Sequence, residues 1–567
     1  MRGFLANWLL LDNSALSAQL AEKTKLPPAL ARVLANRGLG QPEEAEIFFY
    51  GSLDNIPSPF LFSEMNQCLQ RLTQAITKRE KILIFGDYDA DGILALVMLY
   101  RALKSAGGEV DYYIPDRLKE GYGIKEAHLD LIKKRAARLV VTVDCGIRAN
   151  RFVRLAKEAG IDVIITDHHQ PGEERPEAVA VINPVLSSSG YPFRYLAGVG
   201  VAFKVIQALL EKTGRQALVP YYTKLVAIGT IADVVPLVGE NRILVRHGLK
   251  TLGEARNPGL KNLLASCGLN GNRVNEWDIG FRLGPRVNAA GRIESAGLAV
   301  RLFLTNSAQE AAFICGRLNR LNAERQQMEE KTLNQAISRI QEGGWHRKYR
   351  ALILGCEGWH RGIIGIVASR LKERYHRPVI LFSYENDFAY GSGRSISSFS
   401  LIQALQKCYD LFEEFGGHHH AAGCVLERQK MAELKTKLNS LAMACLTEDD
   451  LTPTLIIDSP LRLKEITPSF LDLYSLLPPF GQGNPRPMFL FPQLRIVSGP
   501  QFIQERSFKL KVEQDDRLFE AIVWEKPGLA SEINPGAHFD VAASLGFSRF
   551  WSEETVVLNI EDLAPVG

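Results

Sequence analysis

Between residues 81 and 183, short apolar runs alternate with amphipathic stretches, and this alternation limits the fold more than any other feature of the chain. The apolar runs are KILIF (81–85), EVDYYI (109–114), RLVVTV (138–143), IDVIIT (161–166) and AVAVIN (178–183). Near-continuous apolar strands separated by helices are typical of a parallel sheet that is covered on both faces. The segment therefore predicts an α/β domain, which helices over 196–213 and 221–232 would complete.

The rest of the chain shows three other sequence patterns. A chain of 567 residues is too long for one hydrophobic core, so several domains are expected. Long helical patterns cover 298–342, strand–helix alternation resumes at Tyr349, and short strand-like runs follow an acidic break at Glu448–Asp450. The last pattern predicts a small OB-like β-barrel. The predicted divisions are an N-terminal helical segment (1–55), a catalytic α/β domain (56–255), a helical connector (256–345), a second, smaller α/β domain (346–450) and the barrel domain (451–567).

Acidic and imidazole side chains follow three of the predicted strands directly. They are Asp87, Asp89, Asp91, Asp144, Asp167, His168 and His169. The carboxyl ends of parallel strands share one edge of the sheet, and open α/β folds bind ligands there. Carboxylate oxygens suit Mg²⁺ or Mn²⁺, and an imidazole favours Mn²⁺. The pattern therefore predicts a divalent-metal site at this edge.

The spacing within the first acidic run suggests two ions. Asp89 and Asp91 are two residues apart, so that in an extended turn they can face different metals. Two-metal sites hold their ions roughly 3.5–4 Å apart, with one carboxylate shared between them. Asp144 is the candidate for the shared ligand, because it follows a strand next to the first one.

These motifs also fit other kinds of site. An aspartate after a strand often only caps the next helix, and this alternative stays open for each acid taken singly. DxDxDG also begins a calcium loop, but position 12 counted from Asp87 is Met98 rather than Glu. The chain contains no GxxxxGK[ST] and no GxSxG, and GVGVAFK (198–204) fits the tight start of a helix. The eight cysteines form no CxxC pair, which speaks against a zinc ribbon and is typical of a reduced, cytosolic protein.

These motifs resemble the DHH phosphoesterase family. Its motifs are matched by GDYDADG (86–92), VDCG (143–146), the triplet at 167–169, GTIADVVPL (229–237) and, for the associated DHHA1 domain, GGHHHAAG (416–423). Further segments resemble the single-strand-specific 5′ exonucleases of this family, in order along nearly the whole chain. They are LANRG (34–38), GPRVNAAGRIESA (284–296), LNRLNAERQ (318–326), GWHRGIIGIVASRL (358–371), GSGRS (391–395) and PFGQGNPRP (479–487).

The resemblance implies an architecture and a set of metal ligands. The fold would be a DHH parallel-sheet domain joined by long helices to a DHHA1-like domain, followed by an OB-like barrel. One ion would be held by Asp89 and Asp144, and the other by Asp91, Asp144, His168 and Asp233. His169 would lie beside the scissile phosphate, in a supporting role or as a proton donor, whereas Asp87 and Asp167 would not be principal ligands. The chain departs from the family at Leu94, where Thr or Ser is usual.

Arginine binds phosphate with two parallel hydrogen bonds, so arginines are the first candidates for substrate contacts. Ser392 and Arg394 lie in a Gly-rich turn whose backbone N–H groups can also approach an anion. With Arg117, they are the candidates for a terminal 5′-phosphate. Candidates for contacts along the strand and the cleft are Arg286, Asn288, Arg292 and His418. For each arginine alone, a surface ion pair remains the alternative.

The predicted barrel combines aromatic and cationic residues. They are Phe508, Phe547, Phe550 and Trp551, with Lys509, Lys511 and Arg549. Exposed rings could stack on the bases of a single strand. The alternative is that the rings fill the barrel core.

The sequence and the resemblance together predict a 5′→3′ exonuclease that degrades single-stranded DNA to mononucleotides with two Mn²⁺ or Mg²⁺ ions, in DNA repair and recombination. A net charge of +4 permits nucleic-acid binding without requiring it. One alternative is a phosphodiesterase of the same fold that cleaves short oligonucleotides, cyclic dinucleotides or pyrophosphate. Another is a non-catalytic DNA-binding protein, although no expected metal ligand is missing.

Partners and location are also expectations. The family implies single-stranded DNA, a single-strand binding protein and a RecQ-like helicase as partners, and a monomer is expected. The N-terminal MRGFLANWLLLDNSALSAQ lacks the apolar region and cleavage site of a signal peptide. No apolar run approaches the ~20 residues of a membrane span, so we expect a cytoplasmic protein that does not enter the membrane.

Overall fold

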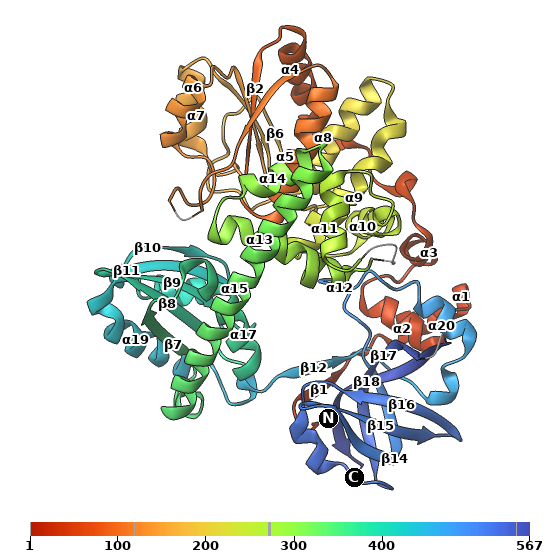
Figure 1. Ribbon diagram of the computed structural model, residues 1–567. Helices are drawn as coiled ribbons and strands as arrows, with labels where there is room; N and C mark the ends of the chain where they lie inside the picture. Colours follow the sequence, from red (N-terminus) through yellow and green to blue (C-terminus); the bar gives the residue numbers. More distant parts are fainter. Residues whose placement is uncertain (1, 118, 270–273, 551–552, 567) are drawn as a thin grey trace. The chain divides into compact units, whose positions relative to one another are not determined.

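The computed structural model describes residues 2–117, 119–269, 274–550 and 553–566, and its chain divides into two compact units. Unit 1 combines Met1–Gly51 with Thr447–Gly567, and unit 2 is Ser52–Leu446. Unit 2 holds both α/β domains and unit 1 holds the barrel (Figure 1). The predicted fold class is therefore confirmed. The association of the N-terminal segment with the barrel was not predicted.

The first sheet of unit 2 is parallel throughout, in the order β3-β2-β4-β5-β6. Its strands are β2 (Lys81–Gly86), β3 (Glu109–Tyr113), β4 (Leu139–Val143), β5 (Asp162–Thr166) and β6 (Ala180–Ile182). Successive residues of β2 enter different cores. Ile82 and Ile84 pack into the core under α5 (Ala90–Ser105) and α8 (Gly198–Lys212), and Leu83 and Phe85 pack into the core under α7 (Asn150–Glu158). Burial of both faces explains the continuous apolar runs.

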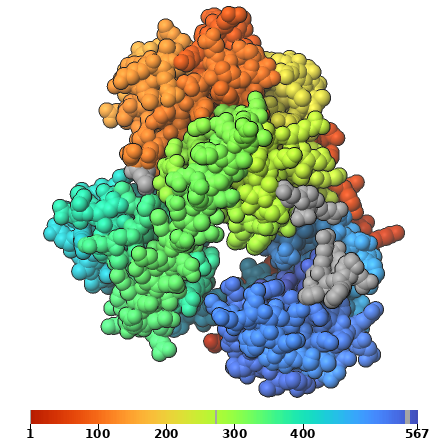
Figure 2. Space-filling view, viewed as in Figure 1, coloured from red at the N-terminus to blue at the C-terminus, as the bar shows by residue number. Residues whose placement is uncertain are grey.

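A layer of helices extends this domain and leads to the next. It contains α9 (Val219–Ala232), α10 (Gly239–Leu252), α11 (Pro258–Ser266), α13 (Gly284–Ile293), α14 (Gly297–Leu304) and α15 (Ala308–Glu342). The first half of α15 contributes Ile314 and Leu318 to the core of the DHH-like domain, and its last turns contribute Ala336 and Ile340 to the core of the second domain. One continuous helix thus belongs to both cores. Figure 2 shows its surface as part of the green band on this face of unit 2.

The second α/β domain has a mixed sheet in the order β10-β11-β9-β8-β7, in which β7 and β8 are parallel and the other neighbours antiparallel. Its strands are β7 (Leu352–Glu357), β8 (Val379–Glu385), β9 (Phe388–Arg394), β10 (Phe412–Gly417) and β11 (Ala421–Glu427), and its helices include α17 (Arg361–Tyr375) and α19 (Met431–Cys445). The candidate residues Ser392 and Arg394 form the end of β9.

Unit 1 is a closed barrel with an N-terminal addition. Its strands are β14 (Phe489–Gln504), β15 (Ser507–Gln514), β16 (Arg517–Val523), β17 (His538–Phe550) and β18 (Glu553–Pro565), and pairing of β14 with β17 closes the barrel. Strand β1 (Asn7–Leu10) pairs in parallel with β12 (Thr454–Ile457). Helices α1 (Ser14–Thr24), α2 (Pro28–Asn36) and α3 (Pro42–Tyr50) share a hydrophobic core with the barrel, to which Leu20, Leu30 and Phe48 contribute.

The candidate aromatic residues of the barrel differ in their exposure to solvent. Phe508 is fully buried in the barrel core, so the core alternative holds for this ring and a stacking role is wrong. Phe547 is 43% exposed and stays a candidate. Trp551 and the side chains of Arg549 and Phe550 lie outside the described residues. At Leu94, where the family usually has a hydroxyl, the side chain is fully buried in the core under α5.

Within the part of the chain that the structure describes, no helix combines the length and the apolar character that crossing a lipid bilayer requires.

Asp562 of β18 attaches the N-terminal segment, and its replacement tests that attachment. Its buried carboxylate accepts hydrogen bonds from the backbone N–H groups of Leu5 and Ala6 and from Nε1 of Trp8. Asp562→Ala would leave these donors unpaired, at a cost of about 1–3 kcal/mol for each that stays buried. We expect faster chymotrypsin cleavage within the first eleven residues, measured by mass spectrometry. Glu520→Ala, at an exposed position of the same barrel, is the control; equal cleavage rates in both variants would contradict this role.

Candidate metal centre

The turns after β2, β4 and β5 meet at the carboxyl edge of the parallel sheet. Asp89 caps α5, accepting hydrogen bonds from the N–H groups of Asp91 (2.9 Å) and Gly92 (3.1 Å). The capping alternative therefore describes one role of Asp89. Asp91 is 1% exposed, and its two oxygens accept hydrogen bonds from Gly198 (2.7 Å) and Val199 (2.8 Å) at the start of α8. The predicted tight helix start thus holds a proposed ligand.

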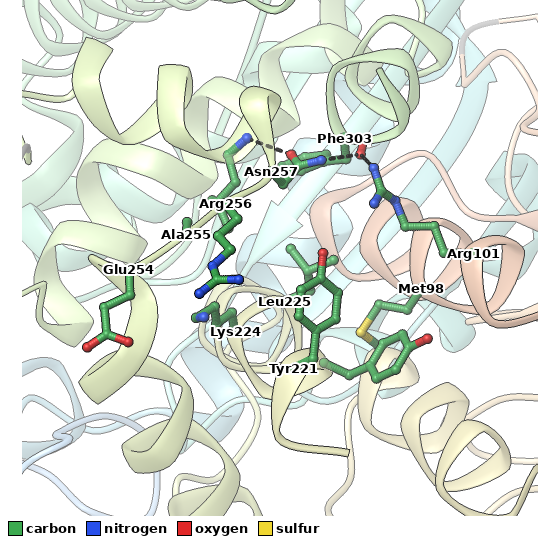
Figure 3. Close-up of a pocket in the computed structure, with 12 residues that line it drawn as sticks. Met98, Arg101, Tyr221, Lys224, Leu225, Glu254, Ala255, Arg256, Asn257 and Phe303 are labelled. Carbon is green, nitrogen blue, oxygen red and sulfur yellow. Dashed lines mark hydrogen bonds between the residues drawn. The ribbon is translucent and has the colours of Figure 1, made fainter. Parts of the chain in front are cut away.

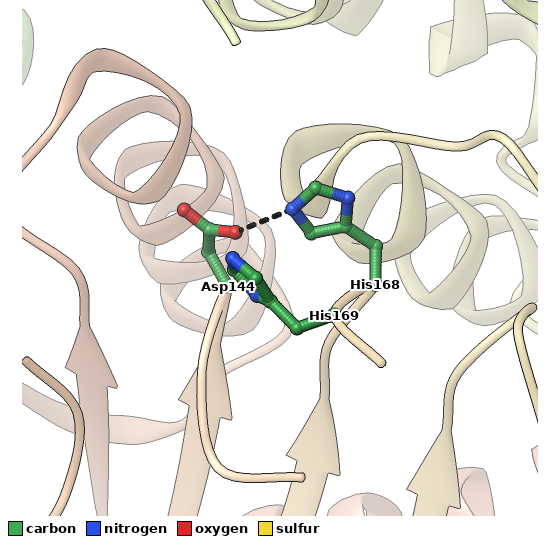
Figure 4. A group of neighbouring side chains, drawn as sticks. All are labelled: Asp144, His168 and His169. Atoms are coloured by element: carbon green, nitrogen blue, oxygen red, sulfur yellow. Dashed lines mark ion pairs between the residues drawn. The ribbon is translucent and has the colours of Figure 1, made fainter. Parts of the chain in front are cut away.

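His168 faces three of the carboxylates. Its Nε2 lies 3.1 Å from Asp144 Oδ1, 3.6 Å from Asp233 Oδ2 and 3.9 Å from Asp91 Oδ2. Figure 4 shows the imidazole turned toward the Asp144 carboxylate. Burial and the neighbouring His169 lower the pKa of His168 to about 4, so the ring is neutral near pH 7. A neutral ring that bonds the backbone of Leu196 keeps a lone pair for a cation.

Among the described residues, Asp144 belongs to two of the three groups of possible ligands, one with Asp87 and Asp89 and one with His168 and His169. Ligand atoms of Asp91, His168 and Asp233 lie within 4.8 Å of one another, and so do those of Asp87, Asp89 and Asp144. Asp144 Oδ1 also lies beside His168 Nε2, so its carboxylate stands between the two groups. The backbone of Asp144 is left-handed (φ 60°), and a Cβ on Gly198 would lie 2.5 Å from its Oδ1. Only glycine at position 198 permits this approach.

Four buried polar atoms at this edge make no hydrogen bond to the described residues. They are Asp87 Oδ1, Asp144 Oδ1, Asp233 Oδ2 and His168 Nε2. Buried acceptors without donors are rare in proteins, and here they converge. Burial and the charge of Asp89 raise the pKa of Asp91 to about 7, and burial with the charge of Asp91 raises the pKa of Asp144 and of Asp233. Oxygen donors with one imidazole fit divalent cations such as Mn²⁺ or Mg²⁺.

Asp87 belongs to this arrangement, although the resemblance gave it no principal role. It is 4% exposed, and burial together with the charge of Asp89 raises its pKa. The DxDxD run in the sequence already indicated that Asp87 could lie near the metal site. Spacing alone cannot tell whether such an aspartate binds an ion or only stabilises the turn.

Asp167 orients His169 rather than the metal group. Its Oδ1 accepts a hydrogen bond from His169 Nδ1 (2.8 Å), and its Oδ2 accepts one from the N–H of Ile147. Burial opposes the charge of His169, but the bond to Asp167 outweighs it and raises the pKa of His169. The Tyr122 hydroxyl lies 3.1 Å from the same Nδ1 and donates to the carbonyl oxygen of Asp144. No spacing rule in the sequence pointed to Tyr122.

A cavity of about 430 Å³ adjoins this pair, and its lining includes Tyr122, His169 and His418. His418 directly follows β10 in the second domain. The candidate His418 therefore shares a cavity with the candidate His169.

Three candidate arginines from two domains gather beside the carboxylates. Burial and the charge of Arg117 lower the pKa of Arg292 to about 10, while Asp89 opposes this shift. Burial and Arg117 likewise lower the pKa of Arg394, whose Nη1 lies 3.4 Å from Ser392 Oγ. Like charges brought together in a partly buried place favour an anionic ligand.

The two remaining candidates have structural partners. Arg286 Nε donates to Asn319 Oδ1 of α15 at 2.8 Å, and Asn288 Oδ1 accepts a hydrogen bond from the N–H of Ala90 at 2.7 Å. Asn288 thus supports the turn that carries Asp89 and Asp91. Its NH₂ group is the part left for a substrate.

Three segments of the chain match known protein families. Residues 81–230 match the DHH family, N-terminal domain; residues 348–444 match the DHHA1 domain; and residues 457–562 match the RecJ OB domain. The chain is 36% identical to the single-stranded-DNA-specific exonuclease RecJ of Bacillus subtilis over 96% of this chain and 69% of that protein. It is 34% identical to the RecJ of Escherichia coli over 96% of each chain.

A solved structure is similar over the whole fold. The crystal structure of RecJ from Thermus thermophilus in complex with Mn²⁺ matches 99% of this chain and 80% of that one, with a TM-score of 0.85 and 29% identity. The same protein in complex with Mg²⁺ matches with a TM-score of 0.78.

Asp144→Asn tests two effects of the carboxylate cluster, the loss of stability from charge repulsion and the binding of divalent ions. Without divalent ions, we expect a higher melting temperature, because the change removes one of several repelling buried charges; about 1 kcal/mol corresponds to roughly 2–4 °C. Added Mn²⁺ should raise the melting temperature of the parent protein and much less that of the variant. Scanning fluorimetry in EDTA and in Mn²⁺ measures both. Asp387→Asn, at an exposed site, is the control. A variant that Mn²⁺ stabilises as strongly as the parent would refute the ligand role.

Proposed function

This chain belongs to the RecJ family of single-stranded-DNA-specific exonucleases, and on that premise we propose that it hydrolyses single-stranded DNA from the 5′ end to mononucleotides with two divalent ions. The observation that carries the proposal is the meeting of two ligand groups at one sheet edge, where Asp144 belongs to one group and lies 3.1 Å from His168 of the other, with three arginines beside them.

We assign one ion to Asp89 and Asp144, with Asp87 close by, and the other to Asp91, Asp144, His168 and Asp233. When bound, Mn²⁺ or Mg²⁺ supplies activation of water and stabilisation of the charge that develops on the phosphate. The residues themselves fix where this happens. Backbone N–H groups of α8 hold Asp91, and the left-handed turn at Asp144 directs its carboxylate between the two groups.

His169 is placed to move a proton. Asp167 holds its Nδ1, which leaves Nε2 directed away from that carboxylate and available to a phosphate or leaving oxygen. Burial of Asp167 favours its neutral form, but the hydrogen bond and charge of His169 outweigh this and lower the pKa of Asp167. An ionised Asp167 keeps the imidazole in one orientation, as a carboxylate partner does for other catalytic histidines.

We propose that Arg117, Arg394 and Ser392 hold the terminal 5′-phosphate and so set the polarity. Arg292 interacts electrostatically with Arg117, Arg394 and Asp89, which suits a contact to the phosphate that is cleaved. Arg286, Asn288 and His418 are proposed to line the path of the strand, with Asn288 using its free NH₂ group.

The cellular setting follows from the family. We propose a role in DNA repair and recombination, action as a monomer in the cytoplasm, and cooperation with a single-strand binding protein and a RecQ-like helicase. The barrel, which matches the RecJ OB domain, is the proposed contact for further nucleotides of the strand.

Digestion of end-labelled DNA tests the function. With Mn²⁺, the protein should degrade a single-stranded oligonucleotide from its 5′ end to mononucleotides and leave a blunt duplex intact, as followed on denaturing gels. His168→Ala should lower the rate by at least about 10²-fold, because it removes a ligand placed among three carboxylates. Equal degradation from the 3′ end would refute the polarity, and no degradation would refute the nuclease assignment.

Arg394→Gln tests the 5′-phosphate pocket. The variant keeps hydrogen-bonding groups but loses the charge, so we expect a lower kcat/KM on 5′-phosphorylated DNA by about 10–100-fold, the effect of about 1.5–3 kcal/mol in charged hydrogen bonds. The rate on 5′-hydroxyl DNA should change little. Arg374→Gln, an exposed position on α17, is the matched control. An equal loss on both substrates would show that Arg394 does not read the terminal phosphate.

A further inference from the structure

A second cavity of about 290 Å³ lies in unit 2, apart from the carboxylate edge (Figure 3). Its lining comes from the later turns of α5, the first turns of α9, the segment before α11 and the end of α14. A helix rises about 1.5 Å per residue, so Arg101 in this lining is roughly 15 Å along α5 from Asp91. The cavity is therefore distinct from the proposed active site, and its volume suits one small ligand rather than a strand.

The charged lining is mostly cationic. The lining contains three cationic side chains, Arg101, Lys224 and Arg256, and one carboxylate, that of Glu254. Arg101 Nη2 donates to the carbonyl oxygen of Phe303 at 2.6 Å. Among the described residues, neither Lys224 nor Arg256 has an ion pair or a side-chain hydrogen bond, and Figure 3 shows the Arg256 side chain extending toward Lys224. Two unpaired cations directed to one place favour an anion that accepts from both.

The rest of the lining is aromatic and apolar. Tyr221 is 48% exposed, and its ring packs edge-on against Tyr222 at 5.7 Å between centroids. Leu260 and Phe303 are buried beneath and contribute apolar surface. A rigid phenol beside apolar side chains suits a planar ring, since aromatic groups prefer offset or edge contacts with one another.

We propose that this cavity binds a small phosphate monoester that carries a planar ring, the class to which nucleoside monophosphates belong, with Lys224 and Arg256 on the phosphate and Tyr221 on the ring. The binding does not rest on the proposed function. If the nuclease assignment also holds, the mononucleotides that the enzyme releases are one source of the ligand.

Two helices connect this cavity with the proposed metal ligands, so a ligand bound here could influence them. Helix α5 carries Asp89 and Asp91 at its start and Arg101 near its end, while α9 carries Tyr221 near its start and is followed by Asp233. A ligand in the cavity therefore contacts the distal ends of both helices. By linkage, any change that it makes in metal affinity must appear equally as an effect of metal on its own affinity.

Calorimetric titration of the full chain in EDTA tests the site, with 2′-deoxyadenosine 5′-monophosphate, deoxyadenosine and inorganic phosphate as probes. We expect saturable binding of the nucleotide, weaker binding of phosphate and of the nucleoside, and a Kd at least tenfold higher for the nucleotide in Lys224→Glu/Arg256→Glu. Arg394→Gln, which alters the proposed 5′-phosphate pocket, should keep the nucleotide binding that the Lys224→Glu/Arg256→Glu variant loses. So should Lys250→Glu/Lys261→Glu, which reverses two exposed charges outside the cavity.

Three outcomes would overturn the proposal. They are absence of saturable nucleotide binding to the parent protein, loss of binding in Arg394→Gln with retention in the Lys224/Arg256 variant, and binding of inorganic phosphate as tight as that of the nucleotide. If the double variant does not fold, Arg256→Gln, a milder change at an exposed position, should also weaken the binding of the nucleotide. Because no DNA and no divalent ion are present, failure of this site and failure of nuclease activity are separate results.

Discussion

Mutual repulsion among carboxylates at one sheet edge is the constraint on which unit 2 depends. Burial disfavours their charge, and each is close to others of the same sign. The fold offsets this with backbone N–H groups: the start of α5 serves Asp89, and the start of α8 serves Asp91. Helix N-termini carry partial positive charge, so both helices are oriented as an anionic edge requires. Divalent cations would neutralise the negative charge of the carboxylates that these N–H groups do not offset.

The strands, the shared edge and most of the acids on it could be predicted from the sequence. Parallel strands that are apolar on both faces leave a clear pattern, as in Ile82–Phe85, and topology then places their carboxyl ends together. Asp233 could not be found in this way, because it follows a helix rather than a strand. The resemblance supplied it. Contacts between distant segments could not be predicted either. Examples are the hydrogen bond from the N–H of Ala90 to Asn288 and the contact of the Tyr122 hydroxyl with His169.

Helix α15 explains why arginines of two domains can serve one site. Because its two ends belong to different hydrophobic cores, the domains are held by a single rigid element rather than by a flexible linker. Arg292 also donates to the carbonyl oxygen of Gly362 at the start of α17, a direct bond from one domain to the other. Preorganised charges lose little free energy to rearrangement when a phosphate arrives, which is where electrostatic catalysis gains most.

The joining of residues 2–51 to the barrel has a consequence for synthesis on the ribosome. Helices α1 to α3 emerge before unit 2, yet the strands that cover Leu20 and Leu30 follow only after the whole of unit 2. At about 5–20 residues per second, the delay is roughly 20–80 s. During that time, apolar side chains of the first segment have no native partner. Unit 2 can fold as it emerges, whereas unit 1 must wait until the barrel strands that follow unit 2 have been made, and its early segment needs protection by chaperones during that time.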